Sequence, residues 1–83
     1  MNIHDREYSL LVGSDVQRDG MFLELYDGPE PNGSPLAECF YSDVDGSFAL
    51  TIYGNQVSDA ALAWLRTEAE RRLPPTAAPP NER

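Results

Sequence analysis

His4 and Cys39 are the side chains best suited to act as a base or a nucleophile, and each type occurs once in the 83 residues. A histidine that acts as a general base needs a positioned nucleophile and a partner that orients its ring, and the residues around His4 supply neither. Cys39 lies between Glu38 and Phe40, whereas a reactive thiol needs a nearby cation or a helix N-terminus that lowers its pKa. We therefore expect no catalytic residue, and we expect Cys39 to be a buried structural residue in a reducing cytoplasm.

The segment 43–46, Asp-Val-Asp-Gly, has the residue types that begin a calcium-binding loop. In such a loop glycine takes the sixth position and a bidentate glutamate takes the twelfth. Counted from Asp43, glycine falls at the fourth position and the twelfth residue is Gly54, so the segment predicts a hairpin turn instead. The sequence also contains no phosphate-binding glycine loop before a helix and no nucleophile elbow. We expect no metal, no cofactor and no enzymatic activity.

Acidic residues dominate the charge of the chain, with 14 carboxylates against six arginines and a net charge of −8. Residues 1–60 hold two arginines and eleven carboxylates, a balance of −9, whereas residues 61–83 have a balance of +1. This charge repels nucleic acid and anionic lipid, whose binding needs lysine or arginine, and it attracts a basic protein surface. The sequence has no apolar run that could span a membrane, and its polar N-terminal residues do not resemble a secretory leader. We therefore expect a cytoplasmic protein with a protein partner, no nucleic acid and no membrane.

The order of apolar and turn residues predicts four strands followed by one helix. Ser58 is a good N-cap for the helix, and Pro74-Pro75 ends it. Leucine and alanine recur between these points at the spacing of a single helical face. Asp19-Gly20 predicts a hairpin turn before the second strand, and the connection 27–35 has the proline and glycine content of a loop. The four expected strands are 8–12, 21–26, 36–41 and 47–53.

Short links between these elements predict an α+β fold, a four-stranded antiparallel β-meander with one C-terminal α-helix packed on one face (ββββα). We expect a single domain over residues 1–73. Residues 74–83 form a tail rich in proline and alanine with no large apolar residue, and we expect this tail to be disordered.

The alternation of side chains along each strand divides the sheet into two faces. The more aliphatic face, which includes Leu10, Leu23 and Leu50, is the natural partner of the helix. The opposite face carries aromatic residues with two glutamates among them, and one helix leaves it open to water or to a partner. The residues that we expect to bind protein on this open face are Phe22, Glu24, Tyr26, Glu38, Phe40 and Tyr53.

These features predict a small acidic non-enzymatic protein that binds another protein, such as an inhibitor or immunity-type protein of a basic target. In size and charge alone, the chain resembles bacterial immunity proteins and phage-encoded inhibitors, and this resemblance covers no motif. One alternative is a homodimer that uses the open aromatic face. Another is a small-ligand carrier or minor enzyme, which would need a concave site with convergent polar groups.

Overall fold

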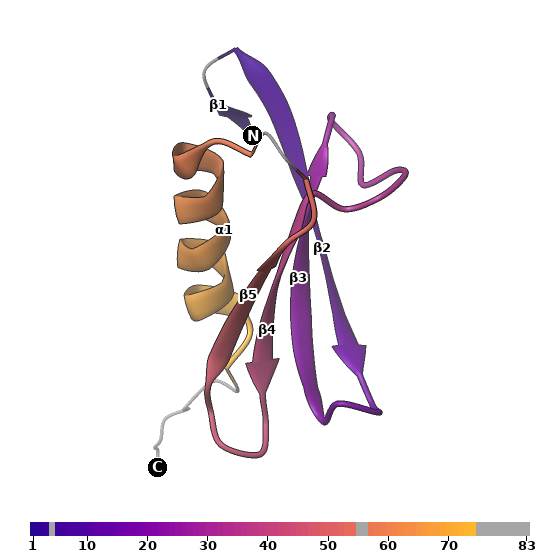
Figure 1. Ribbon diagram of the computed structural model, residues 1–83, viewed down its shortest axis with the longest axis vertical. Coiled ribbons are helices and arrows are strands. Elements are labelled where there is room, and N and C mark those ends of the chain that lie inside the picture. The colour runs from indigo at the N-terminus through magenta and orange to yellow at the C-terminus, as the bar shows by residue number, and fades with distance from the viewer. Residues whose placement is uncertain (4, 55–56, 75–83) are drawn as a thin grey trace.

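Five antiparallel strands and one helix make up the chain in the computed structural model, which describes residues 1–3, 5–54 and 57–74 (Figure 1). The strands pair in the order of the sequence, so the sheet is a simple meander with α1 after its last strand. The predicted α+β class, antiparallel meander and C-terminal helix are confirmed. His4 lies outside the described residues, as does the expected tail from residue 75 onward. The elements are β1 Asn2–Ile3, β2 Arg6–Asp15, β3 Gly20–Asp27, β4 Ala37–Ser42, β5 Phe48–Ile52 and α1 Asp59–Arg72.

The strand count of four was too low, because β1 also joins the sheet. This two-residue strand pairs with Arg6 and Glu7 at the beginning of β2. Asp5, in the turn between the strands, has a φ of 63°. The Met1 nitrogen donates to the Tyr8 carbonyl at 2.7 Å, which extends the contact with β2. A strand of two residues shows no alternation, so its pairing becomes visible only in the tertiary structure.

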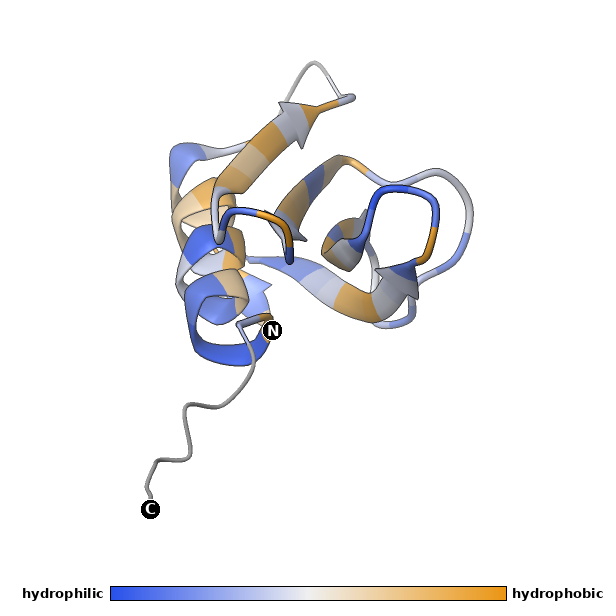
Figure 2. Cartoon of the chain, turned by 90° about the horizontal axis from the view of Figure 1, so that it is seen from below, coloured by the Kyte–Doolittle hydropathy of each residue, from blue (hydrophilic) through white to orange (hydrophobic). Residues whose placement is uncertain are grey.

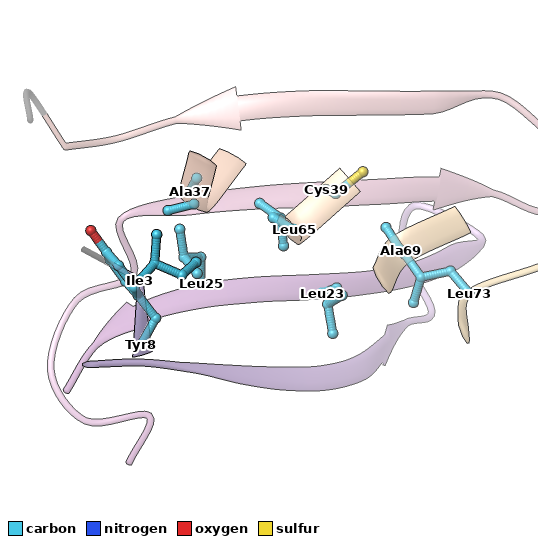
Figure 3. Close-up of a cluster of buried hydrophobic side chains, with 10 residues drawn as sticks. Ile3, Tyr8, Leu23, Leu25, Ala37, Cys39, Leu65, Ala69 and Leu73 are labelled. Atoms are coloured by element: carbon cyan, nitrogen blue, oxygen red, sulfur yellow. The ribbon is translucent and has the colours of Figure 1, made fainter. Parts of the chain in front are cut away.

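The core lies between α1 and the middle of the sheet (Figure 3). α1 packs on β3 and β4, where the buried residues Leu23, Leu25 and Ala37 face Leu65. A helix with its side chains is about 10 Å wide and neighbouring strands are about 4.8 Å apart, so one helix covers about two strands. The view along the strands shows α1 on one side of a strongly twisted sheet (Figure 2).

The ends of α1 agree with the sequence prediction. The Ser58 hydroxyl accepts a hydrogen bond from the Ala61 amide at 3.1 Å, which is the bond expected of an N-cap. The helix runs to Arg72, and Leu73 is its C-cap, directly before the prolines. Both arginines of the last turn, Arg71 and Arg72, lie at the helix end that favours positive charge.

Candidate functional site

Arg18 and Glu38 form the most enclosed ion pair on the sheet face opposite α1. Glu38 is only 5% exposed, and both of its carboxylate oxygens accept hydrogen bonds from the Arg18 guanidinium, at 3.1 and 2.8 Å. Arg18 also donates to Asp15, and its guanidinium carbon lies 4.2 Å from the centroid of the Phe40 ring. The Arg18 side chain therefore covers Glu38 and the Phe40 ring on this face. Both carboxylate oxygens of Glu38 are already hydrogen-bonded within the chain.

Glu24 lies directly opposite Glu38 in the pairing of β3 with β4. Two carboxylates in this position repel each other, and each is stabilised by a different neighbour. Arg18 holds Glu38, whereas the Tyr26 hydroxyl donates to Glu24 at 2.8 Å. This hydrogen bond and burial raise the pKa of Tyr26, which is 6% exposed. Tyr26 is therefore buried against the sheet and holds Glu24, which is half-buried, in place.

Phe22 and Phe40 lie over two glycines that leave room for their rings. A Cβ atom at Gly13 would clash with the Phe22 ring, and one at Gly20 would clash with the Phe40 ring. A Cβ at Gly20 would also clash with the Tyr41 carbonyl oxygen. Both aromatic rings are half-buried in this way. The two rings therefore pack against the backbone of their own sheet and fill the space above its glycines.

The six residues expected to bind protein do share the face opposite α1, but most of them are not open to a partner. The expectation of an open face was wrong at Tyr26 and Glu38, which are buried. Phe22 and Phe40 are half-covered, and Tyr53 is the exposed aromatic residue of the set. Alternation along a strand could assign the face. It could not show that Arg18, twenty residues before Glu38 in the sequence, folds back over it.

Three exposed apolar side chains lie side by side on β5, at the edge of the sheet. Phe48, Leu50 and Ile52 are 40%, 38% and 50% exposed, although they point to the same side of the sheet as α1. The alternation along this strand predicted that these side chains lie on the face covered by the helix. The face was correct, but α1 packs mainly on β3 and β4, and none of these three side chains belongs to the core cluster that the helix covers. Every residue of β5 is exposed, and none is charged.

The backbone of β5 also has free hydrogen-bonding groups, at alternate residues. The Ser42 amide donates to the Ser47 carbonyl at 2.9 Å, and the Tyr53 amide donates to the Leu36 carbonyl at 2.8 Å. Because antiparallel pairing alternates, odd-numbered residues from 47 to 53 direct their N–H and C=O groups toward β4. The backbone groups of the even-numbered residues therefore point outward. We call these outward groups, with the side chains of Phe48, Leu50 and Ile52, the β5 edge.

The other edge of the sheet, formed by β1 and by the part of β2 beyond it, is better protected than β5. β1 pairs with the first two residues of β2, and the Met1 nitrogen bonds to Tyr8 just beyond them. The remaining part of β2 ends in Gly13, Ser14 and the charged Asp15, which weaken pairing with another chain. β5 has none of these features, so it is the edge most open to strand addition.

Arg66 and Glu70 lie about one helical turn apart on the exposed side of α1. Burial raises the pKa of the Cys39 thiol, and the charges of Arg66 and Glu70 act on it in opposite directions. Cys39 lies on β4 and pairs with Leu50, so the charges of Arg66 and Glu70 act on a residue of the strand next to the β5 edge. Arg66 is the one arginine of the described residues without an ion pair, and Glu70 also has none there.

The described residues contain no group of three His, Cys, Asp or Glu side chains arranged to hold a metal ion. In the same part of the chain, no helix is both long and apolar enough to cross a membrane. A shallow, open hollow lies on the surface of α1, lined by Ala63, Arg66, Thr67 and Glu70. No protein-family model, no curated protein and no solved structure matches this chain, so the functional argument is made from the β5 edge itself.

Proposed function

We propose that this protein is a non-enzymatic binding domain that holds an extended segment of another protein as an added strand along the β5 edge. The supporting observation is an edge strand with outward N–H and C=O groups at Phe48, Leu50 and Ile52 and with no charged residue. Proteins usually protect such an edge with charge, proline, a bulge or a covering element. An added strand would pair with the backbone groups and cover the three apolar side chains.

The charge of the chain favours a basic partner. The net charge is −8, and the turn that leads into β5 carries the exposed carboxylates of Asp43 and Asp45. Neither of these carboxylates forms an ion pair with any described residue. A positive partner would be attracted to this end of the molecule before its strand pairs with β5. The partner segment we propose is therefore apolar at alternate positions and flanked by arginine or lysine.

Two matched variants test this proposal. Leu50→Lys places a charge on the β5 edge, and Val12→Lys places the same charge on β2, where the side chain has a similar exposure of 41% against 38%. Each variant and the wild-type chain would serve as bait in a lysate of the organism that encodes the protein, at low and high salt. We expect the wild type and Val12→Lys to retain the same basic protein, and Leu50→Lys to lose it.

High salt should also release the basic partner, because screening weakens the attraction between opposite charges. Circular dichroism of each bait would show that the variants remain folded. Retention of the same partner by Leu50→Lys would refute binding at the β5 edge. A captured protein that is acidic, or that is held equally at all salt concentrations, would contradict the proposed role of charge.

A further inference from the structure

The β5 edge is complementary to itself, and this property identifies an occupant for it when no other partner is bound. We propose that β5 of one molecule pairs antiparallel with β5 of a second copy, with Leu50 at the two-fold axis. This inference rests on the proposed function in that both use the β5 edge. It goes further by naming a specific partner and a specific register.

The positions of the outward backbone groups select the register. Phe48, Leu50 and Ile52 are evenly spaced along β5, and Leu50 is the middle residue. With Leu50 on the axis, it pairs with Leu50 of the partner subunit, and Phe48 pairs with Ile52 of the partner subunit. All outward N–H and C=O groups of both strands then form hydrogen bonds. A shift by two residues would leave one outward residue of each strand beyond the paired segment, without hydrogen bonds. A shift by one residue would put the outward groups of one strand opposite residues whose groups point inward, so these hydrogen bonds could not form.

The side chains are compatible with the same register. The pairing of Phe48 with Ile52 of the partner subunit joins an aromatic and a β-branched residue, which is a favourable cross-strand pair. On the other face, Ala49 lies opposite Thr51 of the partner subunit, and both side chains are small. Since β5 has no charged residue, the register brings no like charges together. The paired strands would join two sheets into one, with both helices on the same side.

Arg66 and Glu70 supply a second, independent complementarity. The charges of both act on Cys39, which pairs with Leu50, and we place both near the level of the proposed axis for this reason. Four strand spacings of about 4.8 Å place the two helices about 19 Å apart, and helices about 10–12 Å wide leave a gap of about 8 Å. With both side chains extended into this gap, two-fold symmetry would set Arg66 of one copy opposite Glu70 of the partner subunit. These two unpaired charges would then form two reciprocal ion pairs.

The net charge of each copy opposes this association. Two chains of charge −8 repel each other, and salt screens that repulsion. We therefore expect a dimer that depends on concentration and becomes tighter as salt rises. A basic partner responds to salt in the opposite direction, so salt distinguishes the second copy from the partner of the proposed function.

The test is sedimentation equilibrium of the full chain from about 1 μM to 1 mM at low and high salt, combined with amide hydrogen exchange by NMR. We expect a monomer–dimer equilibrium and slower exchange of the Phe48, Leu50 and Ile52 amides at high concentration. Leu50→Pro removes an outward N–H group and should give a folded monomer. Arg66→Glu and Glu70→Arg should each weaken the dimer, and the double variant should restore it, because the reversed charges attract again.

A monomer at every concentration, or a dimer whose outward β5 amides exchange as fast as in the monomer, would overturn the inference. If Leu50→Pro does not fold, Leu50→Lys gives the same test without a change in the backbone. A monomeric protein that still captures a basic partner through Leu50 would overturn only the dimer. A β5-paired dimer that captures no partner would overturn only the proposed function.

Discussion

Arg18 is the residue on which the sheet face opposite α1 depends most. It pairs with both oxygens of the buried Glu38, bonds to Asp15 and covers the Phe40 ring. Burying a carboxylate is costly unless it is paired and hydrogen-bonded, so Arg18 makes the position of Glu38 tolerable. The same contacts cover Glu38 and one side of Phe40, two of the six residues that the sequence indicated as a binding site.

Replacing Arg18 with alanine should therefore destabilise the fold. We expect Arg18→Ala to lower the free energy of unfolding by about 2–3 kcal/mol, because it leaves the Glu38 carboxylate buried without a partner. Urea unfolding at neutral pH would measure the change. Arg71→Ala is the control, because it breaks an exposed ion pair with Glu68 and should change stability little. Equal stability of Arg18→Ala and the wild type would show that Glu38 finds another partner or reaches water.

Tyr26 should make stability sensitive to alkaline pH. Its pKa is raised above the ordinary value of 10.0 by its hydrogen bond to Glu24 and by burial. Between the ordinary pKa, which applies to the unfolded chain, and the raised pKa of the folded chain, the unfolded chain has lost the phenol proton and the folded chain keeps it. The free energy of unfolding therefore falls as pH rises through and above 10. Urea midpoints from about pH 8 to pH 11 should decline less steeply for Tyr26→Phe than for the wild type, and equal slopes would contradict this role.

At the scale of the element, β5 is paired along one side only. Its odd-numbered residues face β4, whereas its even-numbered residues face outward. The odd-numbered residues therefore hold β5 in the sheet, whereas the backbone groups of the even-numbered residues are available to another chain. This difference should appear when single backbone N–H groups are removed.

Proline substitutions at Leu50 and Thr51 test the assignment directly. Leu50→Pro removes an outward donor, and a strand tolerates proline where its N–H faces solvent. Thr51→Pro removes a donor that faces β4 and leaves a carbonyl of that strand without its bond, so it should cost about 1–3 kcal/mol more. Thermal unfolding of the two variants would give the comparison. If Leu50→Pro is the more damaging of the two, the β5 edge is not where we place it.

At the scale of the whole molecule, an excess of negative charge coexists with ion pairs that use most of the arginines. Among the described residues, Arg6 pairs with Asp27, Arg18 with Asp15 and Glu38, and Arg71 and Arg72 with Glu68. These arginines lower the pKa of Asp15, Asp27 and Glu68. The carboxylates that remain unpaired give the surface its negative field, which repels a second copy and attracts a basic partner.

Acid should weaken the fold even though it removes the repulsion between carboxylates. Because the pKa values of Asp15, Asp27 and Glu68 are lowered in the folded chain, their stabilisation is complete above the unfolded values of about 4. It is lost as pH falls below those values through the folded ones. Urea midpoints should therefore decrease from about pH 5 to pH 2. An increase over this range would mean that relief of repulsion between carboxylates outweighs the loss of the ion pairs.

The sequence by itself determined the elements that local chemistry specifies. Ser58 and the prolines after Leu73 define the ends of α1, and alternation assigns Leu50 and Phe40 to opposite faces of the sheet. Because hairpin turns and short links can join only neighbouring antiparallel strands, they predict an antiparallel meander. These predictions succeed because each depends on residues that are close together in the sequence.

Only the tertiary structure decided which surfaces remain open. The sequence shows that Phe48 and Ile52 face the helix side, but the width of one helix over a twisted five-stranded sheet leaves β5 uncovered. The pairing of Arg18 with Glu38 and the addition of β1 likewise join parts of the chain through space. Exposure depends on how whole elements cover one another, which is not a property of any single segment. For that reason two of the six expected binding residues, Tyr26 and Glu38, are buried, and the β5 edge became the candidate.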